Sequence, residues 1–203
     1  KNIRKVLTPL KHITPRYSNI EDLLSTRAKY KSETLRALQQ EAGFEGFEKI
    51  CYWSAWDPST PRKGLEYYIE ALHLLASSDK YMDPKELEKV AFVFSGRPDK
   101  FVFHHSFVPE NVRTVVYPLL PSDAVIDLLH VSDLYVCTTL EDAGPRTIPE
   151  ALSCGTPVVS FDQCIATDLV NETNGALVAT RDSYALASGI ATLLNNLPDM
   201  QEN

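Results

Sequence analysis

The chain alternates between short continuous apolar runs and longer amphipathic stretches. Residues 90–95 are a continuous apolar run of strand length, which is typical of a strand buried on both faces of a parallel sheet. Between Leu65 and Leu75, apolar residues recur every three or four positions, which predicts an amphipathic helix. The same reasoning predicts strands over 48–55, 90–95, 112–116, 134–137, 157–161 and 176–179, and helices over 20–42, 65–77, 84–88, 123–130, 148–153, 166–170 and 183–195.

Strands that alternate with helices predict an α/β fold with a Rossmann-like, doubly wound parallel sheet flanked by helices. We expect residues 1–42 to be a linker and leading helix, 43–197 to be the Rossmann-like domain, and 198–203 to be a frayed tail. The first residue is not Met, and the first forty residues resemble a linker that precedes a domain. We therefore expect the chain to be a fragment of a longer protein.

Composition and charge narrow the class of partner. The formal net charge of -7 disfavours a general nucleic-acid surface. No apolar run is long enough to span a membrane and no signal-peptide pattern opens the chain, so we expect a cytoplasmic location. The four cysteines lack metal-ligand spacing and are interpreted as reduced packing residues. Standard dinucleotide, P-loop, zinc-protease and esterase motifs are also missing from the sequence.

Two cations precede the helix predicted to start at Leu65. Arg62 and Lys63 could neutralise a diphosphate there, with help from the partial positive charge of the helix start. Gly64 would let a ligand approach the backbone closely. The alternative is that both cations lie on a solvated loop without a specific role.

Two carboxylates, Asp142 and Glu150, lie between the apolar run 134–136 and the next predicted strand. Glu150 could accept hydrogen bonds from the two hydroxyls of a sugar diol. It could equally close a capping box with Thr147, because a Thr three residues before a Glu is typical of a helix start. Asp142 could reach the same crevice from its loop, or serve only as a turn carboxylate.

Three residues between these carboxylates complete the candidate site. Gly144 would leave room for a pyrophosphate beside backbone amides. Arg146 is either a third cation or a surface residue. Pro145 lies between them.

The two motifs together resemble the C-terminal, nucleotide-sugar-binding domain of GT-B glycosyltransferases of family 4. The resemblance covers residues 28–195 and is carried by Lys63-Gly64 and by Asp142 followed by residues 150–159, Glu-Ala-Leu-Ser-Cys-Gly-Thr-Pro-Val-Val. The chain departs from the family where Asp142 replaces the usual first Glu, where Pro149 replaces an apolar residue, and where Arg62 must substitute for an Arg ahead of the Lys-Gly pair. The Asp-x-x-Pro form of the loop is similar to that of polysaccharide-building enzymes.

The resemblance implies a retaining, metal-independent, hexosyltransferase-type transfer from a nucleotide-diphosphate sugar (UDP-, GDP- or ADP-sugar), with no cofactor. Lys63 with Arg62 would hold the diphosphate, and Glu150 would bond the ribose hydroxyls. Asp142, with the amides of Ala143 to Pro145, would position the donor sugar. No residue of this chain is assigned as a catalytic acid, base or nucleophile.

In the family, an acceptor-binding half precedes this domain. We therefore expect the chain alone to bind donor without turnover, and expect the acceptor glycan or lipid, and any peripheral membrane contact, to involve a missing N-terminal domain. Two alternatives stay open at this point: an epimerase-like enzyme acting on nucleotide sugars, and a non-catalytic donor-binding subunit that needs a partner chain.

Overall fold

The computed structural model describes residues 20–42, 46–97, 108–142 and 144–196. Within them lies a six-stranded, fully parallel sheet with the strand order β3-β2-β1-β4-β5-β6. The strands are, in this spatial order, β3 (Thr114–Tyr117), β2 (Val90–Ser95), β1 (Lys49–Ser54), β4 (Leu134–Cys137), β5 (Val158–Phe161) and β6 (Gly175–Val178). The predicted doubly wound α/β fold is therefore confirmed.

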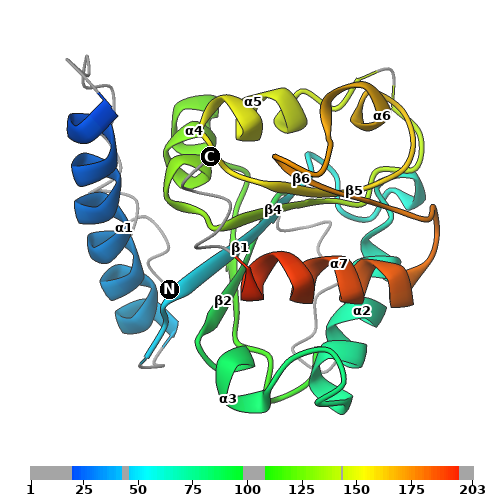
Figure 1. Ribbon diagram of the computed structural model, residues 1–203, viewed down its shortest axis with the longest axis horizontal. Coiled ribbons are helices and arrows are strands. Elements are labelled where there is room, and N and C mark those ends of the chain that lie inside the picture. The colour runs from blue at the N-terminus through cyan, green and yellow to red at the C-terminus, as the bar shows by residue number, and fades with distance from the viewer. Residues whose placement is uncertain (1–19, 43–45, 98–107, 143, 197–203) are drawn as a thin grey trace.

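Helices cover both faces of this sheet (Figure 1). One face carries α2 (Leu65–Ser77), α3 (Pro84–Leu87) and α7 (Ser183–Asn195), and the other carries α1 (Ile20–Ala42), α4 (Ser122–Val131), α5 (Thr147–Ser153) and α6 (Ala166–Leu169). None of the helices in the described ranges is both long and apolar enough to cross a membrane.

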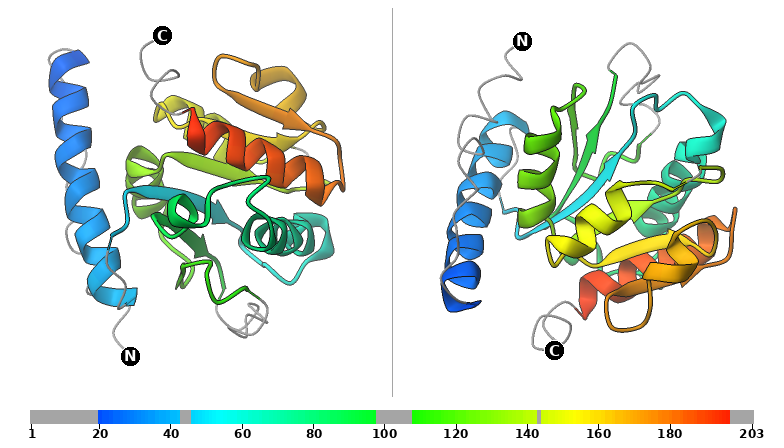
Figure 2. Two further views of the ribbon diagram at one scale, coloured as in Figure 1. Left: turned by 60° about the horizontal axis from the view of Figure 1, so that its bottom comes forward. Right: turned by 90° about the horizontal axis from the view of Figure 1, so that it is seen from above.

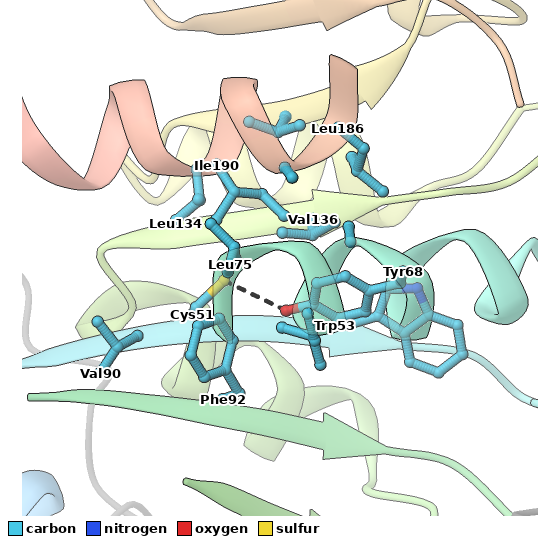
Figure 3. Packing of buried hydrophobic residues seen from close by; sticks show 14 of the residues in the cluster. Cys51, Trp53, Tyr68, Leu75, Val90, Phe92, Leu134, Val136, Leu186 and Ile190 are labelled. Atoms are coloured by element: carbon cyan, nitrogen blue, oxygen red, sulfur yellow. Dashed lines mark hydrogen bonds between the residues drawn. The ribbon is translucent and has the colours of Figure 1, made fainter. Parts of the chain in front are cut away.

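Successive residues of each strand enter different cores because strand side chains alternate between the two faces. In β1, Cys51 and Trp53 enter the core under α2 and α7, whereas Ile50 and Tyr52 enter the core under α4 and α5. Figure 3 shows the first core, with Cys51 beside the hydroxyl of Tyr68. Burial raises the pKa of the Cys51 thiol to about 12, which fits the predicted role as a reduced packing residue.

The leading helix α1 packs against α4 and shares the second core (Figure 2). Leu38 is fully buried, and Lys31 forms an ion pair with the buried carboxylate of Asp133. The other oxygen of Asp133 accepts a hydrogen bond of 2.8 Å from the backbone N–H of Ile50. This carboxylate therefore ties α1 to the start of β1.

The predicted element bounds differ most at β3. The apolar run beginning at Val112 predicted a strand over 112–116, but pairing with β2 joins Phe92 to Thr114 and Ser95 to Tyr117. Val112 instead closes a turn onto the carbonyl of Pro109. Register with the neighbouring strand, which is not visible in a local run of apolar residues, sets these bounds.

Candidate donor-binding site

The candidate residues meet at the place where the strand order of the sheet reverses. The chain runs outward from β1 to β2 and β3, and then crosses over to β4, which pairs with the other side of β1. In an open parallel sheet, the loops that leave the carboxyl ends of two such strands diverge and leave a ligand crevice. These two loops, residues 55–64 and 138–146, carry all the predicted site residues except Glu150.

Three charged side chains form a cluster between the two loops. The Oδ2 atom of Asp142 lies 2.7 Å from Nζ of Lys63 and 3.1 Å from a terminal nitrogen of Arg62. The Lys63 side chain is only 15% exposed, whereas that of Arg62 is 48% exposed. The structure thus brings together the cations and the carboxylate that the sequence suggested for different parts of one donor.

This pairing changes the acidity of Asp142. The hydrogen bond from Lys63 is the largest contribution that lowers the pKa of the Asp142 carboxyl, and the backbone N–H of Gly144, 3.3 Å from Oδ1, lowers it further. Partial burial acts in the opposite direction without overcoming these bonds. The Asp142 side chain is consequently ionised at neutral pH.

The two cations occupy a single 3-10 turn, η3 (Pro61–Lys63), which Gly64 ends in the left-handed conformation at φ 62°. A Cβ atom on Gly64 would lie 2.2 Å from the carbonyl oxygen of Thr138. The space beside Gly64 that was expected to admit a ligand is thus filled by the protein's own backbone. Gly64 is required because the two loops approach each other there.

Glu150 lies in the first turn of α5, with its carboxylate partly exposed. The proposed capping box with Thr147 is not formed, because α5 begins at Thr147, one residue earlier than such a box requires. Its N-cap is Arg146, in a helical conformation and without a side-chain cap, and the Glu150 N–H donates to the Arg146 carbonyl at 3.1 Å. Among the described residues, no hydrogen bond ties the Glu150 carboxylate to the helix start.

The remaining predicted residues of this loop differ in what they offer. Ala143 lies outside the described residues. Gly144 has open space where a Cβ would lie, and its N–H points to Asp142. Pro145 is buried and, being a proline, has no N–H to donate, so the expectation of a donor amide at this position was wrong. Arg146 is exposed at the start of α5.

Sequence reasoning missed the residues beneath this cluster. Thr138 is buried and hydrogen-bonded to both Trp53 and the basic turn, and Gln163, after β5, donates to the carbonyl of Thr139. Hydroxyl groups of Tyr52 and Ser95 lie 2.6 Å apart on the side of the sheet nearer Glu150. The sequence signal for these residues was their position at or just after the carboxyl ends of predicted strands. Within the described part of the chain, no group of three or more His, Cys, Asp and Glu residues is arranged to hold a metal ion.

Comparisons with known proteins agree with this fold. Among solved structures, the chain resembles WaaG, a glycosyltransferase involved in lipopolysaccharide biosynthesis, with a TM-score of 0.62 and 19% identity over 82% of this chain and 43% of that one. Anabaena HepE in complex with UDP and glucose matches with a TM-score of 0.61 and 21% identity, over 83% of this chain and 43% of that one. S. aureus TarM matches with a TM-score of 0.60 and 21% identity, over 76% of this chain and 30% of that one.

At these identities the likeness shows the fold, and the chain spans less than half the length of these proteins. No significant sequence match was found among curated proteins. The family model for glycosyl transferases group 1 matches residues 50–203, from β1 onward, and so includes both loops of the site. The chain therefore belongs to the glycosyl transferases group 1 family.

Proposed function

We propose that the chain is the C-terminal, donor-binding half of a retaining, metal-independent glycosyltransferase of family 4, of hexosyltransferase type, which uses a nucleotide-diphosphate sugar. The observation that supports this most is the cluster of Lys63, Arg62 and Asp142 at the boundary between β1 and β4. It places cations suited to a diphosphate beside a carboxylate suited to sugar hydroxyls.

Binding of donor requires an exchange of partners in this cluster. The diphosphate brings negative charge to Lys63 and Arg62, and therefore competes with Asp142 for the same hydrogen-bond donors. Once displaced, the Asp142 carboxylate is free to accept hydrogen bonds from the donor sugar. The cations then compensate the charge that develops on the leaving diphosphate.

Glu150 is assigned to the ribose. Its carboxylate is not engaged in capping α5, and its two oxygens match the two hydroxyls of a ribose diol. Gly144 leaves room at the loop, and Arg146 lies on the same loop as an additional cation. The acceptor, a glycan or lipid, belongs in this proposal to an N-terminal domain, and the reaction to cytoplasmic polysaccharide synthesis.

The test is isothermal calorimetry of the chain with UDP, GDP and ADP and with their glucose conjugates. We expect one nucleoside diphosphate to bind, and Lys63→Ala to weaken it by about 10- to 100-fold, since a hydrogen bond to a charged group is lost. Lys89→Ala is the matched control, because Lys89 pairs with Glu86 at 2.9 Å in another part of the chain. Absence of binding at millimolar ligand, or donor turnover by the chain alone, would contradict the proposal.

A further inference from the structure

Thr138 lies directly after β4 and is 1% exposed. Its Oγ1 atom accepts a hydrogen bond of 2.9 Å from Nε1 of Trp53 and donates one of 2.8 Å to the backbone carbonyl of Lys63. A hydroxyl has one proton to donate, so these two bonds fix its orientation. The indole of Trp53 is itself held in the core under α2, as Figure 3 shows.

Further backbone contacts bring the same two loops together. The N–H of Leu140 donates to the carbonyl of Arg62 at 2.7 Å, and Gly64 lies against the carbonyl of Thr138. The side chain of Thr138 is the one member of this set that can be changed without altering the backbone. It connects the buried core to the residue whose ammonium group contacts Asp142.

We propose that Thr138 is a positioning residue that fixes the basic turn, and with it the ammonium group of Lys63, against the loop that carries Asp142. The assignment of a diphosphate to this ammonium group rests on the proposed function. Without the Thr138 hydroxyl, the Lys63 carbonyl and the Trp53 N–H lose a buried partner. The turn relieves this loss by moving toward water, which draws Lys63 away from Asp142.

The first experiment needs no ligand. The pKa of the Asp142 carboxyl is measured by NMR titration in the wild-type chain and in Thr138→Val, Thr138→Ser and Thr156→Val. Thr156 is the matched control, since it is also 1% exposed and donates to a backbone carbonyl, that of Leu129, between α4 and the loop before β5. We expect the Asp142 pKa to rise toward its ordinary value in Thr138→Val only. An unchanged value in Thr138→Val, or an equal rise in Thr156→Val, overturns the proposal.

The second experiment separates this proposal from the proposed function. Affinities are measured in the same variants for the nucleoside diphosphate that the wild-type chain binds, out of UDP, GDP and ADP, and for its nucleoside. We expect Thr138→Val to weaken binding of the nucleoside diphosphate by about fivefold, in line with one lost hydrogen bond, and to leave binding of the nucleoside unchanged. On a Lys63→Ala background, Thr138→Val should cause no additional loss, whereas additive losses contradict action through Lys63. A wild-type chain that binds no nucleoside diphosphate refutes the proposed function, while the titration still decides the role of Thr138.

Discussion

Lys63 and Asp142, 79 residues apart in the chain, face each other across the boundary between β1 and β4 with Nζ and Oδ2 separated by 2.7 Å. Lys63 lies on the loop after β1 and Asp142 on the loop after β4. Their ion pair neutralises the positive charge of Lys63, which would attract an anionic ligand, and the negative charge of Asp142, which would repel it. In the proposed function, Asp142 therefore competes with the diphosphate for the ammonium group of Lys63. Binding of a diphosphate to Lys63 would then be coupled to release of the Asp142 carboxylate from Lys63.

Asp142→Asn should increase the affinity for a nucleoside diphosphate without sugar. The amide is isosteric with the carboxylate but carries no charge, so the phosphate no longer competes with an anion for Lys63 and Arg62. Because partly exposed ion pairs contribute only about 0.2 to 1 kcal/mol, the expected gain is about 1.4- to fivefold. Calorimetric titration with the bare nucleoside diphosphate measures it.

Glu141→Gln is the control for this substitution. Glu141 is the neighbouring exposed acid, and Arg62 contacts its backbone carbonyl rather than its carboxylate. The Glu141→Gln substitution changes the net charge by the same amount as Asp142→Asn and should leave the affinity for the nucleoside diphosphate nearly unchanged. An equal gain in both variants would mean that general charge, and not the Lys63–Asp142 pair, limits binding.

Local patterns predicted the elements of this fold but not the pairing at its site. The predicted bounds of β4 and α7 match those observed, because continuous apolar runs and a helical period are properties of neighbouring residues. The Lys63–Asp142 pair depends instead on β1 and β4 being adjacent. The observed strand order, β3-β2-β1-β4-β5-β6, places both loops together, but the local sequence does not encode that order.

Gly64→Ala should destabilise the chain by at least about 2 kcal/mol. An alanine at φ 62° is strained by about 1 to 2 kcal/mol, and its Cβ would also meet the Thr138 carbonyl oxygen at 2.2 Å. Gly144→Ala is the control, because a Cβ there meets nothing within 4 Å, and it should change stability by no more than about 0.5 kcal/mol. Urea denaturation of both variants measures the difference, and equal midpoints would contradict the close approach of the two loops.

Asp127 of α4 should make stability depend on pH in the opposite direction to Asp142. Burial, and then the charge of Asp123, raises the pKa of the Asp127 carboxyl to about 6, so the folded state disfavours its ionised form. The contribution of the protonated Asp127 carboxyl to the free energy of unfolding is fully present below the ordinary pKa of Asp and is lost as the pH rises through about 6.

Asp127→Asn should therefore match the wild-type stability near pH 4 and exceed it near pH 8, by up to about 3 kcal/mol. Denaturant titrations at the two pH values measure this effect. Asp168→Asn, an exposed carboxylate in the first turn of α6, is the control and should show no such gain. A gain for Asp127→Asn that is equal at both pH values would mean that the substitution acts through packing and not through ionisation.

Glu150→Ala should weaken nucleotide binding while leaving the stability of the chain within about 0.5 kcal/mol of the wild type. The reason is that α5 starts from Arg146 without a side-chain cap, so Glu150 contributes no capping bond to be lost. The sharpest readout compares UDP with its 2′-deoxy analogue in both proteins. If the Glu150 carboxylate bonds the ribose diol, the 2′-deoxy analogue should bind the wild type less tightly than UDP does. The two ligands should bind Glu150→Ala about equally tightly, because this variant lacks the carboxylate that would accept a hydrogen bond from the 2′-hydroxyl. A large loss of stability with unchanged nucleotide affinity would instead return Glu150 to a structural role at the start of α5.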